Sequence, residues 1–596
     1  MTKQYKIHFL FCLFCFSFIY SQSSYQTNKS QSACPNSLNQ ESLDINNVDA
    51  LLFTGGDMFW NLFGDGKNHY EFPKGTQKNV VGPSALWIGG LDGGGQLKIA
   101  AQTYRQTGWD FWPGPLEMTA STDFYNCIRY DRFWKVDYKQ ITEFISNYKA
   151  GNVALNTYTP CESILSWPAV DSLIYDNTTS DYLKPAPYRD INFNGIYSPK
   201  NEGDYPQLKG DQQLFCIFND KGDVHTETGG QSIGIEVRLT AYAYGCPSTI
   251  AQYPELANTT FYHYKIINKS PYNLNKTYVG FWSDIGIGDY KDDYIGSNQK
   301  EGYVYGYNAT PFDSVYGNFI PATGTVLLKG PLADSNDLLD NNGDGNIDEA
   351  GEEITIPTIT YFNTLFNNVG NPIAQMTRPT VASHYYNYMT GFWKDGSPFT
   401  CGGNGYGGTT QINSIFTSSY TPIGPCGSNW TEISAGNPSG DRTYLLSAGT
   451  FTLEANSSIE FEIAFVTSMD SSATNSNLAS VIKLEQDIQK IKNFYKLAVK
   501  PSCIDTNLIA KSIYPKKKEI TFGPNPVEQE ITINFEQYYS YVSTVKIYDL
   551  LGRVMFENKY INQEIAKIDL SHLSKAVYLI EINSGSFKLV KKLFKQ

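Results

Sequence analysis

The sequence contains none of the motifs that mark the common hydrolases and nucleotide-binding enzymes. Its 596 residues hold no HExxH zinc-protease motif, no GxSxG nucleophile elbow and no phosphate-binding Walker loop. The six histidines are isolated from one another. A glycosidase needs only two suitably spaced carboxylates, so the sequence does not exclude this class of enzyme. Glu236 and an aspartate of residues 284–293 are one conceivable pair. Because Glu236 stands near Arg238, a polar strand face is the simpler interpretation, and a body without catalysis is favoured.

Charged residues and long apolar runs are also scarce. Asp, Glu, Lys and Arg make up 18% of the chain, and the net charge is −13. Nucleic-acid binding requires a clustered Lys/Arg footprint, which this acidic composition argues against. Beyond the first 21 residues no run approaches the ~20 apolar residues of a membrane-spanning helix, so we expect no transmembrane segment in the mature chain. The 43 tyrosines and 50 glycines are typical of β-rich extracellular proteins.

Residues 1–21 have the organisation of a secretory signal peptide. Lys3 and Lys6 form a positive start, residues 9–19 form an apolar run too short to cross a bilayer, and small polar residues follow. Residues 22–42 are polar and indicate a loose lead-in. The sequence therefore predicts export across the inner membrane into the periplasm.

Short alternating runs separated by Gly, Pro and Asn dominate residues 43–500. After Ser457, apolar residues at 459, 461, 463 and 465 alternate with Glu460 and Glu462, as in a half-buried antiparallel strand. Two helices are predicted, at 139–148 and 477–495, where apolar residues recur every three or four positions. We therefore predict an all-β, multidomain chain. It has a large sandwich- or jelly-roll-like body over 43–500 in one or two lobes, a linker over 501–518 and a small Ig-like β-sandwich over 519–596.

Ten cysteines are present, and two of them lie in the predicted signal peptide. The even number that remains fits disulfide bonds in an exported protein, although the sequence does not fix their pairing. Cys401 and Cys426 flank a Gly-rich loop with little else to hold it together, so we predict a bond between them. Among the eight cysteines outside the predicted signal peptide there is no CxxC motif and no Cys/His ligand spacing, which argues against zinc.

The strongest candidate metal site is the acidic loop DNNGDGNIDEAGEE, which starts at Asp340. Oxygen-bearing side chains recur at alternate positions, and Gly345 permits the sharp turn that gathers six to eight oxygens around calcium. Gly351 occupies the position of the expected bidentate glutamate, so a neighbouring glutamate would have to substitute, and a solvated acidic turn is the alternative. The predicted calcium ligands are Asp340, Asn342, Asp344, Asn346 through its backbone carbonyl, and Asp348.

A weaker copy of the pattern starts at Asp190, in DINFNGIYSPKNEGD. Its candidate ligands are Asp190, Asn192 and Asn194, of which only one is charged. Glu202 or Asp204 would have to strengthen this site, and calcium and a plain turn are equally favoured.

Two other groups of residues are candidate sites. Aspartates at 284, 289, 292 and 293 have a spacing that fits no metal-binding pattern, so we expect a solvated loop there. The aromatic residues Trp87, Trp109, Phe111 and Trp112 could stack on sugar rings, but large aromatic side chains pack well in any core, and core packing is favoured.

The C-terminal segment carries an ordered series of short motifs. They are Pro524, Asn525 and Pro526, then Tyr548, Asp549, Gly552 and Arg553, then Val577, Tyr578 and Leu579, then Lys591, Lys592 and Lys595. The series resembles the type A C-terminal sorting domain of the bacterial type IX secretion system, although Ala576 stands where such domains usually have Gly. The resemblance implies that the type IX machinery is a partner of this chain and carries it across the outer membrane.

The body resembles uncharacterised secreted proteins that carry the same sorting domain, in stretches such as ALWIGGLDGGGQL and FWSDIGIGDYKDDYIG. That resemblance implies no known activity. We therefore expect a secreted or cell-surface protein with a calcium-supported binding or adhesion body, for which a glycan or surface lipopolysaccharide is a candidate partner. The competing hypothesis is an extracellular polysaccharide hydrolase, which a deep cleft with two carboxylates ~5–10 Å apart would favour.

Overall fold

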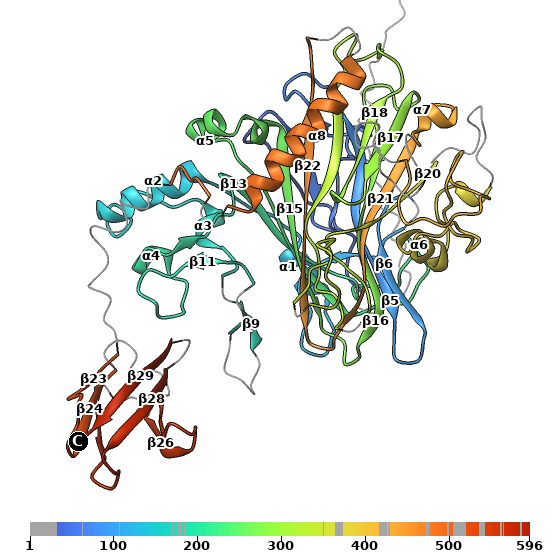
Figure 1. Ribbon diagram of the computed structural model, residues 1–596. Coiled ribbons are helices and arrows are strands. Elements are labelled where there is room, and N and C mark those ends of the chain that lie inside the picture. Colours follow the sequence, from blue (N-terminus) through green and yellow to red (C-terminus); the bar gives the residue numbers. More distant parts are fainter. Residues whose placement is uncertain are drawn as a thin grey trace, which may run out of the picture. The chain divides into compact units, whose positions relative to one another are not determined.

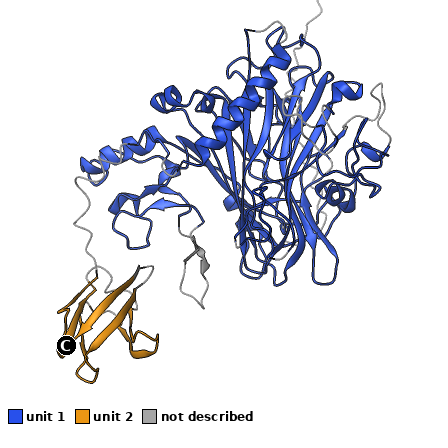
Figure 2. Ribbon diagram, in the orientation of Figure 1, with its two compact units in different colours: residues 1–504 blue, residues 505–596 orange. Residues whose placement is uncertain are grey.

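The computed structural model describes residues 33–596 with short gaps, and the predicted signal peptide lies outside the described residues. The gaps are 62, 107, 170, 176–181, 184, 336, 350, 364–373, 417–425, 427–429, 473–475, 498–499, 505–519, 536–542, 561–562, 564 and 585–586. The chain divides into two compact units, of which the first ends at Ile504 and the second begins at Asp505 (Figure 2). Each unit is β-rich, which confirms the predicted all-β class.

One of two large sheets in the body is built around two long antiparallel strands, β5 and β16. Phe281 of β16 lies opposite Leu86 of β5 on one side and Leu446 of β21 on the other. In spatial order the strands are β1 (Gln40–Leu43), β2 (Asp49–Phe53), β3 (Asp57–Met58), β5 (Val81–Leu91), β16 (Leu274–Ile285), β21 (Arg442–Leu453) and β20 (Thr358–Asn363), with β4 (Tyr70–Glu71) beside β2 and β6 (Leu97–Ala101) beside β5.

The second large sheet is also antiparallel, and its middle strand β15 connects β14 to β22. Tyr262 of β15 lies opposite Ala241 of β14 and Ile463 of β22. In spatial order the strands are β17 (Asp293–Asn298), β18 (Tyr303–Asn308), β19 (Ala322–Lys329), β22 (Ser458–Ser468), β15 (Thr259–Asn268), β14 (Ile235–Ala243), β13 (Gln212–Asn219) and β7 (Trp112–Pro113), with β8 (Trp134–Asp137) beside β13.

A hydrophobic core lies between the inner faces of the two sheets. The ring of Phe281 in the first sheet lies 5.6 Å from that of Phe465 and 6.5 Å from that of Tyr262 in the second. Phe461, Ile463 and Phe465 are fully buried in this core, as the alternation after Ser457 predicted. Two sheets that bury one face each against the other form a sandwich.

Helices cover parts of the outer faces. Helix α8 (Ser476–Tyr495) lies across the second sheet (Figure 1) and buries Leu484 and Ile488 against Ala464 and Val466. It confirms the predicted helix at 477–495, and α2 (Tyr138–Lys149) confirms the one at 139–148. The remaining short elements of the body are α1 (Phe124–Tyr130), α3 (Glu162–Leu165), α4 (Pro199–Glu202), α5 (Pro247–Gln252), α6 (Ala382–Met389), α7 (Glu432–Ala435), the 3₁₀ helices η1 (Pro254–Asn258) and η2 (Ala374–Met376), and the strand pairs β9 (Asp171–Tyr175) with β10 (Tyr182–Leu183) and β11 (Tyr188–Arg189) with β12 (Tyr205–Pro206).

Three disulfide bonds join distant or loosely structured parts of the body. The Cys401–Cys426 bond closes the Gly-rich loop and confirms the predicted pair. Cys34–Cys127 and Cys246–Cys503 are the other two, while Cys161 and Cys216 are unpaired. The bond to Cys503 connects the end of the body, after α8, to the start of α5.

The C-terminal unit is a small sandwich of a three-stranded and a four-stranded sheet around a core of its own. In the turn before Arg553, the Asp549 carboxylate accepts from the backbone N–H groups of Leu551 and Arg553 and pairs with the Arg553 side chain at 2.6 Å. Gly552 has a φ of +80°, as the Asp-x-x-Gly pattern requires. The strands are β23 (Thr521–Gly523), β24 (Glu530–Asn534) and β27 (Ile565–Asp569) in one sheet, and β26 (Val554–Tyr560), β25 (Ser543–Tyr548), β28 (Ala576–Ser584) and β29 (Phe587–Lys595) in the other.

The fold predicts that the Cys246–Cys503 bond stabilises the body. The bond spans 257 residues, so its removal releases a long loop in the unfolded chain and should cost roughly 2–5 kcal/mol. We expect the double variant Cys246→Ser/Cys503→Ser to unfold at a lower urea concentration than the wild type. The variant Cys161→Ser is the control and should not share this loss. Equal midpoints for the double variant and the wild type would contradict the prediction.

Candidate functional site

A cleft of about 430 Å³ opens on the outer face of the second sheet, next to the area covered by α8. Its floor comes from neighbouring strands, and its wall comes from the segment around β11. A volume of this order suits a small ligand or a few sugar rings. The lining residues are Phe215, Arg238, Thr240, His263, Lys265 and Glu460 on the sheet, and Pro185, Ala186, Pro187, Tyr188, Asp190 and Lys209 around it.

Strand register brings the polar floor together. Thr240 of β14 lies opposite His263 of β15, which in turn lies opposite Glu462 of β22. Lys265 is likewise paired with Glu460. Because side chains two residues apart share a face of a strand, these residues form one polar area. Farther along β22, the same face carries Ala464, which α8 covers. The cleft therefore ends at the edge of the area that α8 covers.

Glu462 is the buried anionic centre of this area. Its carboxylate accepts hydrogen bonds from Tyr242 Oη at 2.5 Å and Tyr495 Oη at 2.9 Å, and Lys209 Nζ lies 3.4 Å away. Burial raises the pKa of Glu462, but His263, Lys209 and the two hydroxyl groups outweigh it and leave the pKa below its usual value. Glu462 is therefore ionised at neutral pH.

His263 stands between two carboxylates. Its Nδ1 lies 3.8 Å from Glu462 and its Nε2 lies 3.9 Å from Glu460. Burial lowers the pKa of His263 to about 4, and the positive charges of Lys209 and Lys329 also lower it. Glu462 and Glu460 raise this pKa, but their effect is smaller. The imidazole is therefore neutral near pH 7, and its buried Nδ1 has no hydrogen-bond partner.

The two carboxylates are poorly suited to glycoside hydrolysis. That reaction needs one carboxyl group that stays protonated near neutral pH as the general acid. The Glu460 pKa is lowered because its ion pair with Lys329 outweighs the effect of burial, and the Glu462 pKa is also lowered. Both are held as anions, so the floor offers hydrogen-bond acceptors and fixed charges, not a proton donor.

Glu236, the other acid considered for catalysis, is engaged elsewhere. It is fully buried, lies 2.7 Å from Arg238 Nη2 and accepts from the backbone N–H of Leu116. Asp284 belongs to the first sheet, so the structure does not show Glu236 and Asp284 as a pair. A buried ion pair with its hydrogen bonds satisfied is a structural element.

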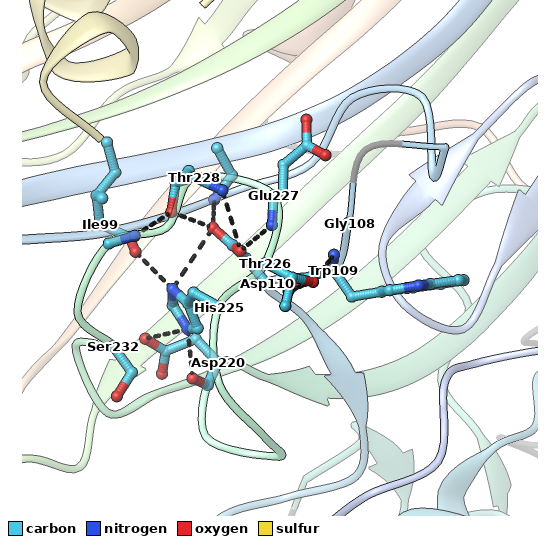
Figure 3. Close-up of polar contacts among 12 residues, drawn as sticks. Ile99, Gly108, Trp109, Asp110, Asp220, His225, Thr226, Glu227, Thr228 and Ser232 are labelled. Carbon is cyan, nitrogen blue, oxygen red and sulfur yellow. Dashed lines mark hydrogen bonds and ion pairs between the residues drawn. The ribbon is translucent and has the colours of Figure 1, made fainter. Parts of the chain in front are cut away.

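A second buried polar network surrounds His225 (Figure 3). Both ring nitrogens donate to backbone carbonyls, Nδ1 to Ile99 and Nε2 to Asp220, each at 2.8 Å. A ring that donates from both nitrogens carries a positive charge. Asp110 Oδ2 and Asp220 Oδ2 lie 3.5 and 3.9 Å from it and supply the balancing charge. Their oxygens also accept several backbone N–H groups, so this network fixes loops and has no free group for a ligand.

The Asp340 loop adopts a tight turn. Asp340 accepts from the backbone N–H groups of Gly343, Asp344 and Gly345, and Asn342 accepts from that of Asp344. Among the described residues, no three His, Cys, Asp or Glu side chains converge as they would around a metal ion. Calcium at this loop stays a prediction.

The weaker loop at Asp190 has a similar turn and borders the cleft. Asp190 accepts from the backbone N–H groups of Asn194 and Gly195, and Asn194 donates to Glu202 at 3.0 Å. The buried carboxylate of Asp204 accepts from the N–H of Ile191. The structure thus brings to this loop the two acids that the sequence named as possible reinforcement.

The expectation of a solvated loop for the third acidic group is wrong at its two ends. Asp293 is fully buried, and Asp284 has a buried oxygen to which no group donates. Asp289 and Asp292 are half-buried, and Tyr290 and Lys291 between them are exposed. Packing of the strand ends of β16 and β17, which sequence spacing does not report, buries the outer two. The expectation of core packing is confirmed for Trp87, Phe111 and Trp112, which are almost fully buried.

The sequence analysis did not single out His263 or Lys265 as site residues. A pattern did exist, because polar residues alternate with buried ones in both TTFYHYKIIN and SSIEFEIAFV. Only strand pairing shows that the polar faces of these two distant segments meet.

Comparisons with known proteins bear on the C-terminal unit. Residues 522–596 match the family model of the secretion system C-terminal sorting domain, which confirms the domain predicted from its motifs. The chain is therefore cargo of the type IX secretion system, directed to the cell surface or the extracellular space. Within the described residues no helix is long and apolar enough to cross a membrane.

The other two comparisons carry no argument about the rest of the chain. A search of curated proteins found no match. Among solved structures, a polysaccharide lyase aligns at 8% identity over 60% of this chain and 34% of its own, with a TM-score of 0.15. A similarity this low carries no argument about fold or function.

The low pKa of His263 predicts a pH dependence of stability. The folded state binds this proton at about pH 4 and the unfolded state near 6.5, so acidification through this range favours unfolding, by about 3 kcal/mol for this group. In urea unfolding at several pH values, His263→Gln should lose less stability on acidification than the wild type. The exposed His572→Gln is the control. A wild-type profile for His263→Gln would contradict the assignment.

Proposed function

We propose that this type IX cargo is a binding or adhesion module that holds a saccharide in the cleft on the outer face of the second sheet. The observation that supports the proposal most is the cleft itself, a cavity of about 430 Å³ with charged and hydroxyl side chains on its floor. A saccharide presents many hydroxyl groups, which need donors and acceptors placed around them.

The composition of the cleft supports a sugar more than an apolar ligand. Lys265 and Thr240 offer donors, and Glu460 offers acceptors. Tyr188 and the prolines at 185 and 187 border the polar floor and provide the flat, apolar surface on which a sugar ring can pack. The same chemistry suits the saccharide part of lipopolysaccharide, which remains a candidate partner.

Binding fits this cleft better than hydrolysis. The lowered pKa values of Glu460 and Glu462 leave no protonated carboxyl group to act as general acid. His263 is neutral, and Glu462 is already occupied by two tyrosine hydroxyl groups. Glu460, Glu462 and His263 therefore present fixed charges and hydrogen-bonding groups, which suit the binding of a polar ligand.

Calcium is the second part of this proposal, at the Asp340 loop and, more weakly, at the Asp190 loop. Two facts support it: Asp340 already organises the turn through three backbone N–H groups, and Asp190 lines the cleft. A cation that neutralises Asp190 and its neighbours would hold the cleft wall in position. Calcium would then support binding without touching the ligand.

The cleft predicts a binding defect for Lys265→Glu. Lys265 is exposed, so the substitution should leave the fold intact while it places a carboxylate beside Glu460. Against a panel of purified neutral and acidic polysaccharides and lipopolysaccharide, we expect affinity for the bound member to fall about tenfold or more, that is by at least 1.4 kcal/mol. Lys300→Glu, another exposed lysine outside the cleft, is the matched control. Unchanged binding by Lys265→Glu would exclude the cleft as the saccharide site.

The calcium part predicts a change in thermal stability. A ligand that binds only the folded state at a hundredfold excess over its Kd adds about 2.7 kcal/mol. We expect the unfolding temperature of the wild type to be higher in calcium than in chelator. The double variant Asp340→Ala/Asp344→Ala should lose the part of this shift that the Asp340 loop contributes. A double variant with the full wild-type shift would show that this loop is only a turn.

A further inference from the structure

One end of the sandwich buries carboxyl groups from both sheets. Asp284 lies near the end of β16 and Asp441 directly before β21, while Asp293 begins β17 in the second sheet. The Asp284 and Asp441 carboxyl groups are in hydrogen-bonding contact, and the backbone N–H of Gly440 donates to the carbonyl of Asp293. Three strand ends from two sheets therefore meet here.

Several oxygens at this place have no partner. Asp293 is fully buried, and its Oδ2 accepts from the N–H of Ile287, but its Oδ1 has no hydrogen bond. Asp284 Oδ2 accepts from Tyr104 Oη at 2.7 Å, and no N–H or hydroxyl group donates to its buried Oδ1, although its carboxyl group contacts that of Asp441. The buried Oδ1 of Asp292, next to Asp293, also has none. All of these atoms are acceptors.

Asn308 provides an independent observation, because it is neutral and lies directly opposite Asp293 on the paired strand β18. Side chains of directly opposite residues stand on the same face of a sheet, about 5 Å apart at Cβ. The Asn308 amide is fully buried and donates to the carbonyls of Thr310 and Phe312, which fixes its orientation. Its Oδ1 is left buried and without a partner beside Asp293.

The basic side chains near this cluster are engaged elsewhere. Arg442 is in a buried ion pair with Glu432 at 2.9 Å, and Lys291 lies over the ring of Tyr290. In the part of the chain that the structure describes, no ion pair joins Asp284, Asp292 or Asp293 to a lysine or arginine. Buried carboxylates without a counter-charge are strongly destabilising, so a proton or a cation is required.

Protons are the alternative to a cation in this cluster. Burial and the neighbouring Asp441 raise the pKa of Asp284 well above its usual value, so a proton could link that pair in the absence of a cation. Burial also raises the pKa of Asp293 well above its usual value, so a second proton, on Asp293, could be donated to the amide oxygen of Asn308. A cation bound by Asp293 and Asn308 would satisfy the same two oxygens, and the response to calcium separates the two cases.

We propose that a calcium ion binds at this end of the sandwich, with Asp293 and Asn308 as its side-chain ligands and the Asp284–Asp441 pair as the adjacent negative charge. Calcium accepts carboxylate, amide, backbone carbonyl and water oxygens together. Zinc instead prefers nitrogen and sulfur ligands. No three His, Cys, Asp or Glu side chains converge among the described residues, so calcium would take its remaining ligands from backbone carbonyls and water. The ion would hold the β16–β17 connection and clamp the two sheets together at this edge, far in sequence from the Asp340 loop.

The test uses the full chain in the Asp340→Ala/Asp344→Ala/Asp190→Ala background, so that neither the Asp340 loop nor the Asp190 loop contributes. Bound calcium and the unfolding temperature are measured in calcium and in chelator, with and without the further substitution Asp293→Asn. We expect the background protein to retain a calcium-dependent rise in unfolding temperature and Asp293→Asn to remove it, with about a tenfold or greater loss of calcium affinity. In chelator, Asp293→Asn should unfold at a higher temperature than its background, because a neutral amide replaces an unpaired buried carboxylate.

A control variant and a second measurement accompany this test. Asp395→Asn changes an aspartate of an exposed turn and should leave the calcium response intact. If Asp293→Asn does not fold, terbium luminescence of the background protein, sensitised by the nearby Tyr104 and Trp282 and displaced by calcium, tests the same site. A background protein with no calcium response and no displaceable terbium signal would overturn the proposal in favour of a shared proton. An unchanged calcium response in folded Asp293→Asn would also overturn it. Neither result depends on whether the cleft binds a saccharide.

Discussion

The cost of removing charge from water constrains the arrangement of polar residues throughout this body. A sandwich of two large sheets buries many side chains, and each buried charge needs a partner with satisfied hydrogen bonds. Arg105 accordingly binds Asp57, with Nη2 2.6 Å from the carboxylate, and His225 is held between Asp110 and Asp220. These pairs lock loops onto the sheets. The cluster at Asp293 departs from the rule, because it has no basic partner among the described residues, and this is why we propose an ion there.

The same constraint explains where a ligand can bind. On the outer face of β22, Ala464 and Val466 are apolar and are covered by α8. Glu462 is buried at the end of this area, where Tyr495 of α8 donates a hydrogen bond to it. Glu460, two residues away, stays half-exposed and lines the cleft that the segment around β11 forms. The helix therefore covers the apolar part of the face, and the cleft opens over the polar part.

Local sequence patterns predicted the features that depend on near neighbours. The alternation after Ser457 gave β22 with the correct buried face, and the periodicity at 477–495 gave α8. The Cys401–Cys426 bond followed from a loop that nothing else could hold. The solvated loop expected around Asp293 was wrong, because burial there results from the meeting of β16, β17 and β21. The residues of β5 and β21 that pair with β16 lie more than about a hundred and fifty positions away from it, as Asp284 and Thr443 do, and no short window of sequence contains that information.

By itself, the sequence determined the export route, the all-β class and the individual strands and helices, because motifs, alternation and helical periodicity are local properties. The tertiary structure decided which polar residues share a surface. His263 became a candidate site residue because β15 pairs with both β14 and β22, and Asp293 became a candidate ligand because Asn308 lies opposite it. A site is a set of atoms close in space, and long-range strand register, which the local pattern leaves open, determines that closeness.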